Sequence, residues 1–167
     1  MLVKIFSSAV HGVEAIPITI EVNVMQGQGY YIVGLPDSSV KESLQRTESA
    51  IKTNGYKMPR TKLVINLSPA DIRKSGAAFD LAIATGILAA SGQLENTGRL
   101  SEFIIMGELN LDGAVQPVKG VLSIALQAHA AGFRNIIVPR QNAKEAALVS
   151  GLAVYGIVHI SELTGFF

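Results

Sequence analysis

Serine, histidine and carboxylate side chains could support hydrolytic or metal chemistry, but their spacing in this sequence forms no recognisable site. The three histidines, His11, His129 and His159, have no second histidine at the i+3 or i+4 spacing that would build a metal site on a helix. No serine lies in a G-x-S-x-G turn, the motif that presents a nucleophile between a strand and a helix. The chain has no cysteine, which excludes thiolate nucleophiles and thiolate metal ligands. We therefore expect no metal site in these residues.

Nucleotide chemistry lacks its usual motif as well. A phosphate cradle needs G-x-x-x-x-G-K-[ST], whose backbone N–H groups and lysine hold the phosphates, and this pattern is absent. Gly27 and Gly29 are expected in a turn between two strands, which is the wrong context for a dinucleotide site. Among the scattered carboxylates, Asp80 is expected at the start of an apolar helix, where it could cap free amides or meet a cation. Capping is the role we predict for it. We expect no cofactor site in this chain.

The positive charge of the chain is concentrated in its middle. The whole sequence has a formal net charge of +1, whereas residues 35–74 hold eight bases and four acids, a difference of +4. This excess is modest for a nucleic-acid groove, so an ordinary solvated surface and a phosphate-binding surface both remain open.

The elements that would position these residues begin with a sheet. Apolar and polar residues alternate at 16–24, as expected for a strand with one buried face, and a short apolar strand is predicted at 3–6. Residues 26–29 predict a turn, which makes Tyr30–Val33 the returning strand of a hairpin. We expect an antiparallel meander.

Helices and strands alternate in the rest of the chain. Asp37 or Ser38 is expected to cap a helix that ends at Asn54 and Gly55, and further helices are predicted at 77–90, 120–131 and 142–150. The predicted strands are 62–67, 103–106, 114–118, 133–139 and 154–158, with a long loop at 68–76. The fold class is therefore α/β (α+β), with an antiparallel start and then alternating helices and strands that form a parallel or mixed sheet.

Length and composition predict one domain over residues 1–167. The chain is 49% hydrophobic and 16% charged, enough for a sizeable core, and it shows neither a signal peptide nor an apolar stretch of bilayer length. We expect a soluble, cytoplasmic protein with no membrane contact. The aromatic end at Phe166 and Phe167 suggests a piece of a longer protein.

Four linked motifs point to a family: GLPDSSVKES at 34–43, VINLSPAD at 64–71, KSGAAFDLAIATGIL at 74–88 and GELNLDG at 107–113. Together they resemble the N-terminal domain of the magnesium chelatase-like AAA+ ATPases of the ComM/YifB type, over essentially the whole chain. The resemblance implies the fold of the Lon protease proteolytic domain, related to ribosomal protein S5 domain 2. It also implies an AAA+ module after residue 167 that binds ATP and magnesium, a homo-oligomeric ring, and DNA branch migration in ComM-type members.

The segment GAVQPVKGVLSIALQA at 113–128 is similar to the part of Lon that carries its catalytic lysine. Active Lon domains pair that lysine with a serine at the start of the small-residue helix, because the amine must take the serine proton. The register of the resemblance places these positions at Ala78 and Leu122, so both reactive groups are missing. Ser75 and Lys119 each lie three residues earlier, about one helical turn, and a displaced dyad of these two is the alternative.

Our first hypothesis is thus a non-catalytic domain for ring assembly and DNA handling. Its candidate phosphate contacts are the basic residues Lys57, Arg60, Lys62, Arg73 and Lys74. These residues could equally decorate a surface while DNA is bound elsewhere. The second hypothesis is a serine-lysine peptidase that uses Ser75 and Lys119. Metal insertion into a tetrapyrrole has no support in these residues.

Overall fold

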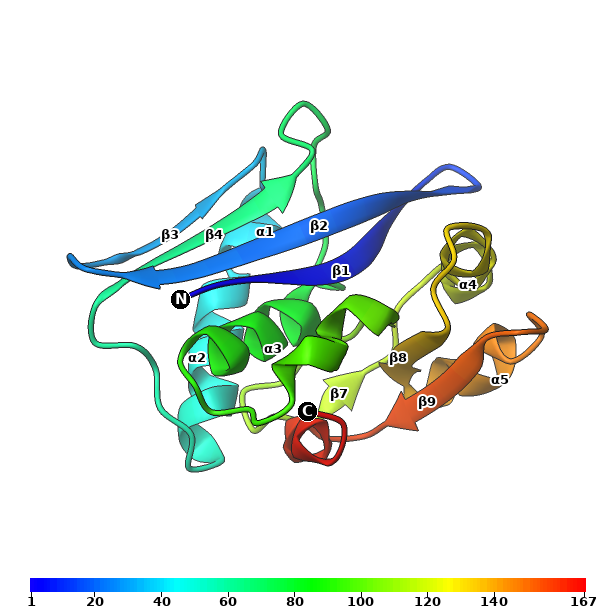
Figure 1. The fold of residues 1–167 in the computed structure, drawn as a ribbon. Helices are drawn as coiled ribbons and strands as arrows, with labels where there is room; N and C mark the ends of the chain where they lie inside the picture. Colours follow the sequence, from blue (N-terminus) through cyan, green and yellow to red (C-terminus); the bar gives the residue numbers. More distant parts are fainter.

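The computed structural model describes residues 1–167, and one seven-stranded sheet runs through it in the order β3-β4-β2-β1-β5-β8-β9. Figure 1 shows β3 and β4 beside β2 in one part of the molecule and β8 and β9 in the other. β2 pairs antiparallel with both β1 and β4, whereas the other four pairings of the sheet are parallel. A separate hairpin joins β6 to β7. The strands are β1 (Leu2–His11), β2 (Glu14–Met25), β3 (Tyr30–Val33), β4 (Lys62–Ser68), β5 (Phe103–Ile105), β6 (Glu108–Leu109), β7 (Val115–Gln116), β8 (Asn135–Pro139) and β9 (Ala153–Ile157). The chain thus has the mixed α/β architecture predicted, with a mostly parallel central sheet.

The helices lie on both faces of this sheet. Successive residues of β5 point to opposite faces, and they enter two different apolar clusters: Phe103 and Ile105 pack in the larger cluster with α2 and α3, and Ile104 in the smaller one with α4 and α5. The helices are α1 (Ser38–Lys41), α2 (Ser43–Thr53), α3 (Asp80–Ala90), α4 (Val121–Ala130) and α5 (Ala143–Ala146), with 3₁₀ turns η1 (Thr97–Glu102), η2 (Arg140–Asn142) and η3 (Ile160–Gly165).

Helix α3 is buried on every side, as its small-residue sequence predicts. All of its residues are buried, and it packs against β1, β2 and α2. Gly86 allows the closest approach, because a Cβ at this position would lie 2.5 Å from Cγ2 of Val22. No helix in the structure has both the length and the apolar character needed to cross a bilayer.

In the antiparallel half of the sheet, β2 confirms the alternation predicted at 16–24, and β4, predicted as a strand at 62–67, alternates as well. In β4 every second residue is buried, and β2 follows the same pattern at Ile18, Ile20 and Val22. The predicted hairpin between β2 and β3 is wrong. β4 lies between them and pairs in parallel with β3. β3 is short and only half covered, so it takes the sheet edge, while the more buried β4 takes the inner position.

The observed helix ends differ from the predicted ones more than the strand positions do. Asp37 caps α1 through a hydrogen bond from the Val40 amide, 2.8 Å, as expected. The helix predicted at 142–150 is only α5 with its flanking turns, and the helix predicted from residue 77 begins at Asp80. The 3₁₀ turns η1 and η3 were not predicted, because such short segments have no periodicity of their own.

Candidate nucleic-acid interface

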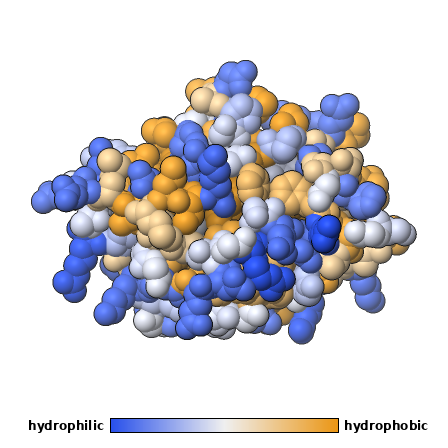
Figure 2. Space-filling view, in the orientation of Figure 1, coloured by the Kyte–Doolittle hydropathy of each residue, from blue (hydrophilic) through white to orange (hydrophobic).

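A basic cavity lies at the loop that connects helix α2 to strand β4. It has a volume of about 670 Å³ and is open on one side. Its walls are formed by Tyr30, Lys52, Tyr56, Lys57, Met58, Pro59 and Arg60. Hydrophilic side chains project from the left and lower edges of the molecule in Figure 2, the region where Figure 1 places the loop between α2 and β4. We name this the basic cavity.

The loop that forms the basic cavity is held at several points. The side chain of Asn54 closes α2 by donating to the Ala50 carbonyl, 2.8 Å. The side-chain amide of Gln93 binds both the N–H and the C=O of Lys57, at 2.8 and 2.7 Å. The Tyr30 hydroxyl donates to the Pro59 carbonyl, 2.6 Å, and Met58 is buried in the core beneath the loop. The backbone that carries the basic side chains is therefore fixed before any ligand arrives.

The charges of the basic cavity are largely uncompensated. Lys57 and Arg60 are exposed, and neither forms an ion pair. Lys52 instead pairs with Glu48 at 2.7 Å, and this hydrogen bond raises the pKa of the lysine. The cavity lining contains no acidic residue. An anion that enters it meets two free cations and a third that is partly neutralised.

Lys62 lies beside the basic cavity on the other face of the sheet edge. Its ammonium is 5.3 Å from the ring centroid of Tyr31, which is 50% exposed. Tyr30 and Tyr31 are consecutive in β3, so their rings point to opposite faces of the sheet. Three of the predicted phosphate contacts, Lys57, Arg60 and Lys62, are thus brought together at one end of β4.

Arg73 and Lys74 lie beyond the opposite end of β4, roughly 20 Å away along a seven-residue strand at about 3.3 Å per residue. Arg73 is exposed. Lys74 is fully buried, and its ammonium donates to the carbonyls of Gly34 and Pro69. Burial lowers the pKa of Lys74. The prediction that Lys74 contacts phosphate is therefore corrected, because its side chain is enclosed by its own loops.

A second cavity, of about 400 Å³, contains the residues that the Lon resemblance singled out. Ala78, Ser75 and Lys119 all line it, together with Ser8, His11 and Glu108 among others. Leu122 is not part of the lining; it lies on the exposed side of α4. No hydrogen bond joins the Ser75 hydroxyl to the Lys119 amine.

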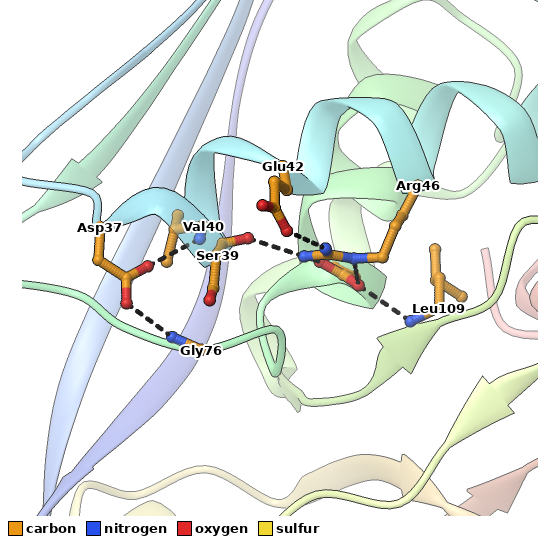
Figure 3. Close-up of polar contacts among 8 residues, drawn as sticks. Asp37, Ser39, Val40, Glu42, Arg46, Gly76 and Leu109 are labelled. Atoms are coloured by element: carbon orange, nitrogen blue, oxygen red, sulfur yellow. Dashed lines mark hydrogen bonds and ion pairs between the residues drawn. The ribbon is translucent and has the colours of Figure 1, made fainter.

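An ion pair that the sequence predicts only in part lies at the start of α3, directly after Phe79 of the cavity lining. Asp80 is fully buried and binds Arg46 through both carboxylate oxygens, at 2.6 and 2.9 Å (Figure 3). It also accepts from the Leu109 amide, while Arg46 donates to the Ser39 carbonyl. The hydrogen bond to Asp80 raises the pKa of Arg46. Asp80 thus meets a cation, and the capping role predicted for it is wrong: it makes no cap hydrogen bond at the start of α3.

Sequence reasoning missed the aromatic walls of the basic cavity. Tyr56 directly precedes Lys57, and this pairing of an aromatic with a basic residue was the available signal. Tyr30 could not be linked to it from the sequence, because the two tyrosines meet only after β3 has paired with β4.

The structure therefore defines a mixed α/β domain with a preformed basic cavity and no phosphate loop. The sequence model of the family described as "Subunit ChlI of Mg-chelatase" matches residues 20–142, and the chain belongs to this family. YifB of Salmonella typhimurium is 43% identical over 166 residues, which are 99% of this chain and 32% of YifB. Competence protein ComM of Haemophilus influenzae is 43% identical over 155 residues, 92% of this chain and 30% of ComM.

A more distant similarity links the chain to Lon protease. The enzyme of Brevibacillus choshinensis is 25% identical over 159 residues, which are 87% of this chain and 20% of Lon. The chain spans about a third of the length of YifB and ComM, so these relatives contain further sequence that has no counterpart here.

Proposed function

We propose that this chain is a non-catalytic accessory domain of a magnesium chelatase-like AAA+ ATPase, and that it serves DNA handling and assembly of a homo-oligomeric ring. The family membership and the ComM and YifB relatives support this role. The similarity to Lon protease supports a Lon-type fold, related to ribosomal protein S5 domain 2. The AAA+ module would lie in the part of the relatives that this chain does not span.

ATP and magnesium belong to that module and not to this domain. Gly27 and Gly29 are the glycines whose spacing could form a phosphate-binding loop, but they precede strand β3 and not a helix. Their backbone therefore does not form a cradle at a helix N-terminus, and the residues described here do not fit a nucleotide triphosphate.

The observation that carries the DNA-handling role is the group of unpaired cations at one end of β4, of which Lys57 and Arg60 are exposed and Lys62 is half-buried. Lys57, Arg60 and Lys62 form no ion pairs, and Gln93 fixes the loop at Lys57. Phosphate binding by such side chains releases counterions and is independent of base sequence. The binding constant is therefore expected to fall steeply with salt.

The test is charge reversal of this group. Lys57→Glu, Arg60→Glu and Lys62→Glu, combined in one chain, are expected to weaken binding of a fluorescent oligonucleotide strongly. The slope of the logarithm of the binding constant against the logarithm of the salt concentration is expected to fall by about two to three. The matched control carries the same change of charge at Arg134, Arg140 and Lys144, which are exposed and unpaired in the last third of the chain. Equal loss in both variants, or loss in neither, contradicts the assignment.

A serine-lysine peptidase is the second candidate, and one observation favours it: Ser75 and Lys119 line the same cavity. Such a reaction requires the lysine amine to take the serine proton, so the two groups must come within hydrogen-bond reach. Incubation with unstructured peptides tests it. Cleavage that disappears in Ser75→Ala supports the peptidase, and intact peptides after long incubation contradict it.

A further inference from the structure

We propose that the basic cavity binds single-stranded nucleic acid, with a base stacked against Tyr56 and Tyr30 and the adjoining phosphates on Lys57 and Arg60. This inference rests on the proposed function and names the form of nucleic acid that the site takes. The observation behind it is the pairing of two aromatic rings with three cations around one open cavity.

The volume and lining of the cavity fit one nucleotide unit. Small-molecule sites have volumes of about 300 to 1,000 Å³, and this cavity has about 670 Å³. Tyr30, Tyr56, Met58 and Pro59 supply apolar and aromatic walls, while the cations lie among them. Base stacking on aromatic rings tolerates any base, because every base has a π face, and cationic residues alongside follow the backbone.

A duplex cannot use this arrangement. Its bases are stacked on one another inside the helix, so a duplex would reach only the cations at the rim. A single strand can turn a base into the cavity and gain the contact with the rings as well. The preference for a single strand over a duplex therefore measures the contribution of the tyrosines, and the salt dependence measures that of the cations.

Residues beside the basic cavity could bind the next nucleotide of the strand through the same two kinds of contact, an aromatic ring and a cation. Tyr31 and Lys62 present a further ring and a further cation on the other face of β3, with the ammonium 5.3 Å from the ring centroid. A strand that leaves the basic cavity around the sheet edge meets this pair next. Gly27 packs closely against this pair, since a Cβ at that position would lie 3.2 Å from Cβ of Lys62.

The experiment measures binding of fluorescent oligo-thymidine, the same strand with abasic sites, and a duplex of equal length, each to this chain at low salt. The wild-type chain is expected to bind oligo-thymidine about tenfold more tightly than either of the other probes. Tyr56→Leu keeps the apolar contact with the core and is expected to remove that preference, whereas Tyr56→Phe keeps the ring and the preference. Thermal unfolding confirms that both variants are folded.

The outcomes separate this inference from the proposed function. Equal binding of all three probes by the wild-type chain, abolished by reversing Lys57 and Arg60, overturns the stacking site and leaves DNA handling intact. Binding that charge reversal leaves unchanged contradicts the proposed function itself. The abasic probe needs no mutation, so the inference remains testable even if Tyr56→Leu fails to fold.

Discussion

The carboxylate of Asp80 joins four elements through its partners and has no access to water. It binds Arg46 of α2 and the Leu109 amide of β6, and Arg46 in turn holds the Ser39 carbonyl of α1. A buried ion pair contributes little against an apolar replacement of both partners, but removal of one partner leaves a charge with no counterpart. The pair is therefore a structural link that fails when either residue changes alone.

Asp80→Asn is expected to lower the free energy of unfolding by roughly 2 kcal/mol, because Arg46 loses the charge of its buried partner and keeps only the exposed Glu42, 3.5 Å away. Urea denaturation measures this loss. Glu48→Gln breaks the exposed pair with Lys52 and serves as the control, with little expected change. If the two variants lose the same stability, the link through Asp80 is not what the geometry indicates.

Lys74 makes the free energy of unfolding depend on pH in the alkaline range. Its pKa is lowered by burial, so between that pKa and the ordinary value of 10.5 the unfolded chain binds more protons than the folded one. Stability from this group therefore rises with pH across that window and is constant below it. The difference in unfolding free energy between wild type and Lys74→Met is expected to shift in favour of wild type as pH approaches 10.5. A flat difference from neutral pH to that point argues against a lowered pKa.

At the scale of elements, period-two alternation was enough to place β2 and the strand-forming run at 62–67 was enough to place β4, but neither pattern determined the order of the strands. Both strands are solvated on one face, which produces the pattern in the sequence. Which strand lies beside β2 depends on burial along the whole sheet, and a sequence read locally favours the nearest partner, β3. For this reason the hairpin prediction was wrong although each strand was correctly located.

The candidate site was predictable in the same way: single residues could be identified, but not which of them face one another in the fold. The sequence identified Lys57, Arg60 and Lys62 as candidate phosphate contacts; Lys57 and Arg60 are exposed, whereas Lys62 begins β4 and is half-buried. Nothing in the residues around Lys74 indicates that it turns inward, since its enclosure by the Gly34 and Pro69 carbonyls depends on two loops that meet only in the fold. The tyrosine walls likewise come from segments that strand pairing brings together.

The packing of α3 on the sheet predicts the effect of a single methyl group. Gly86→Ala is expected to destabilise the fold by about 1 to 3 kcal/mol despite the better helix propensity of alanine, because the new Cβ would meet Val22. Combining it with Val22→Ala should recover part of this loss, a coupling that a double-mutant cycle measures by chemical denaturation. Strictly additive effects would mean that the two side chains do not meet.

At the scale of the whole molecule, the two apolar clusters are unequal. The larger has 30 buried residues and includes α3, whereas the smaller, around α4 and α5, has 11. Local opening is easiest where few buried contacts must be broken. The two clusters therefore divide the molecule into a part that resists local opening and a part that opens more readily.

Amide hydrogen exchange is expected to show this division. Amides of β2, β4 and α3 should exchange only through global unfolding, and those of α5 and β9 should exchange faster, through local opening. Mass spectrometry of exchanged peptides resolves the two regions. Uniform protection over both would show that the smaller cluster opens only with the rest of the molecule.

The contact between β1 and β5 has a consequence for how the chain folds. Its register rests on the pair Phe6 and Ile104, which join the antiparallel and parallel parts of the sheet across 98 residues of sequence. Contacts between distant segments close a long loop and form slowly, whereas β1 and β2 are joined directly through a short turn. The order of events during folding should therefore run from the β1–β2 pair outward, with the docking of β5 on β1 as a late and slow step.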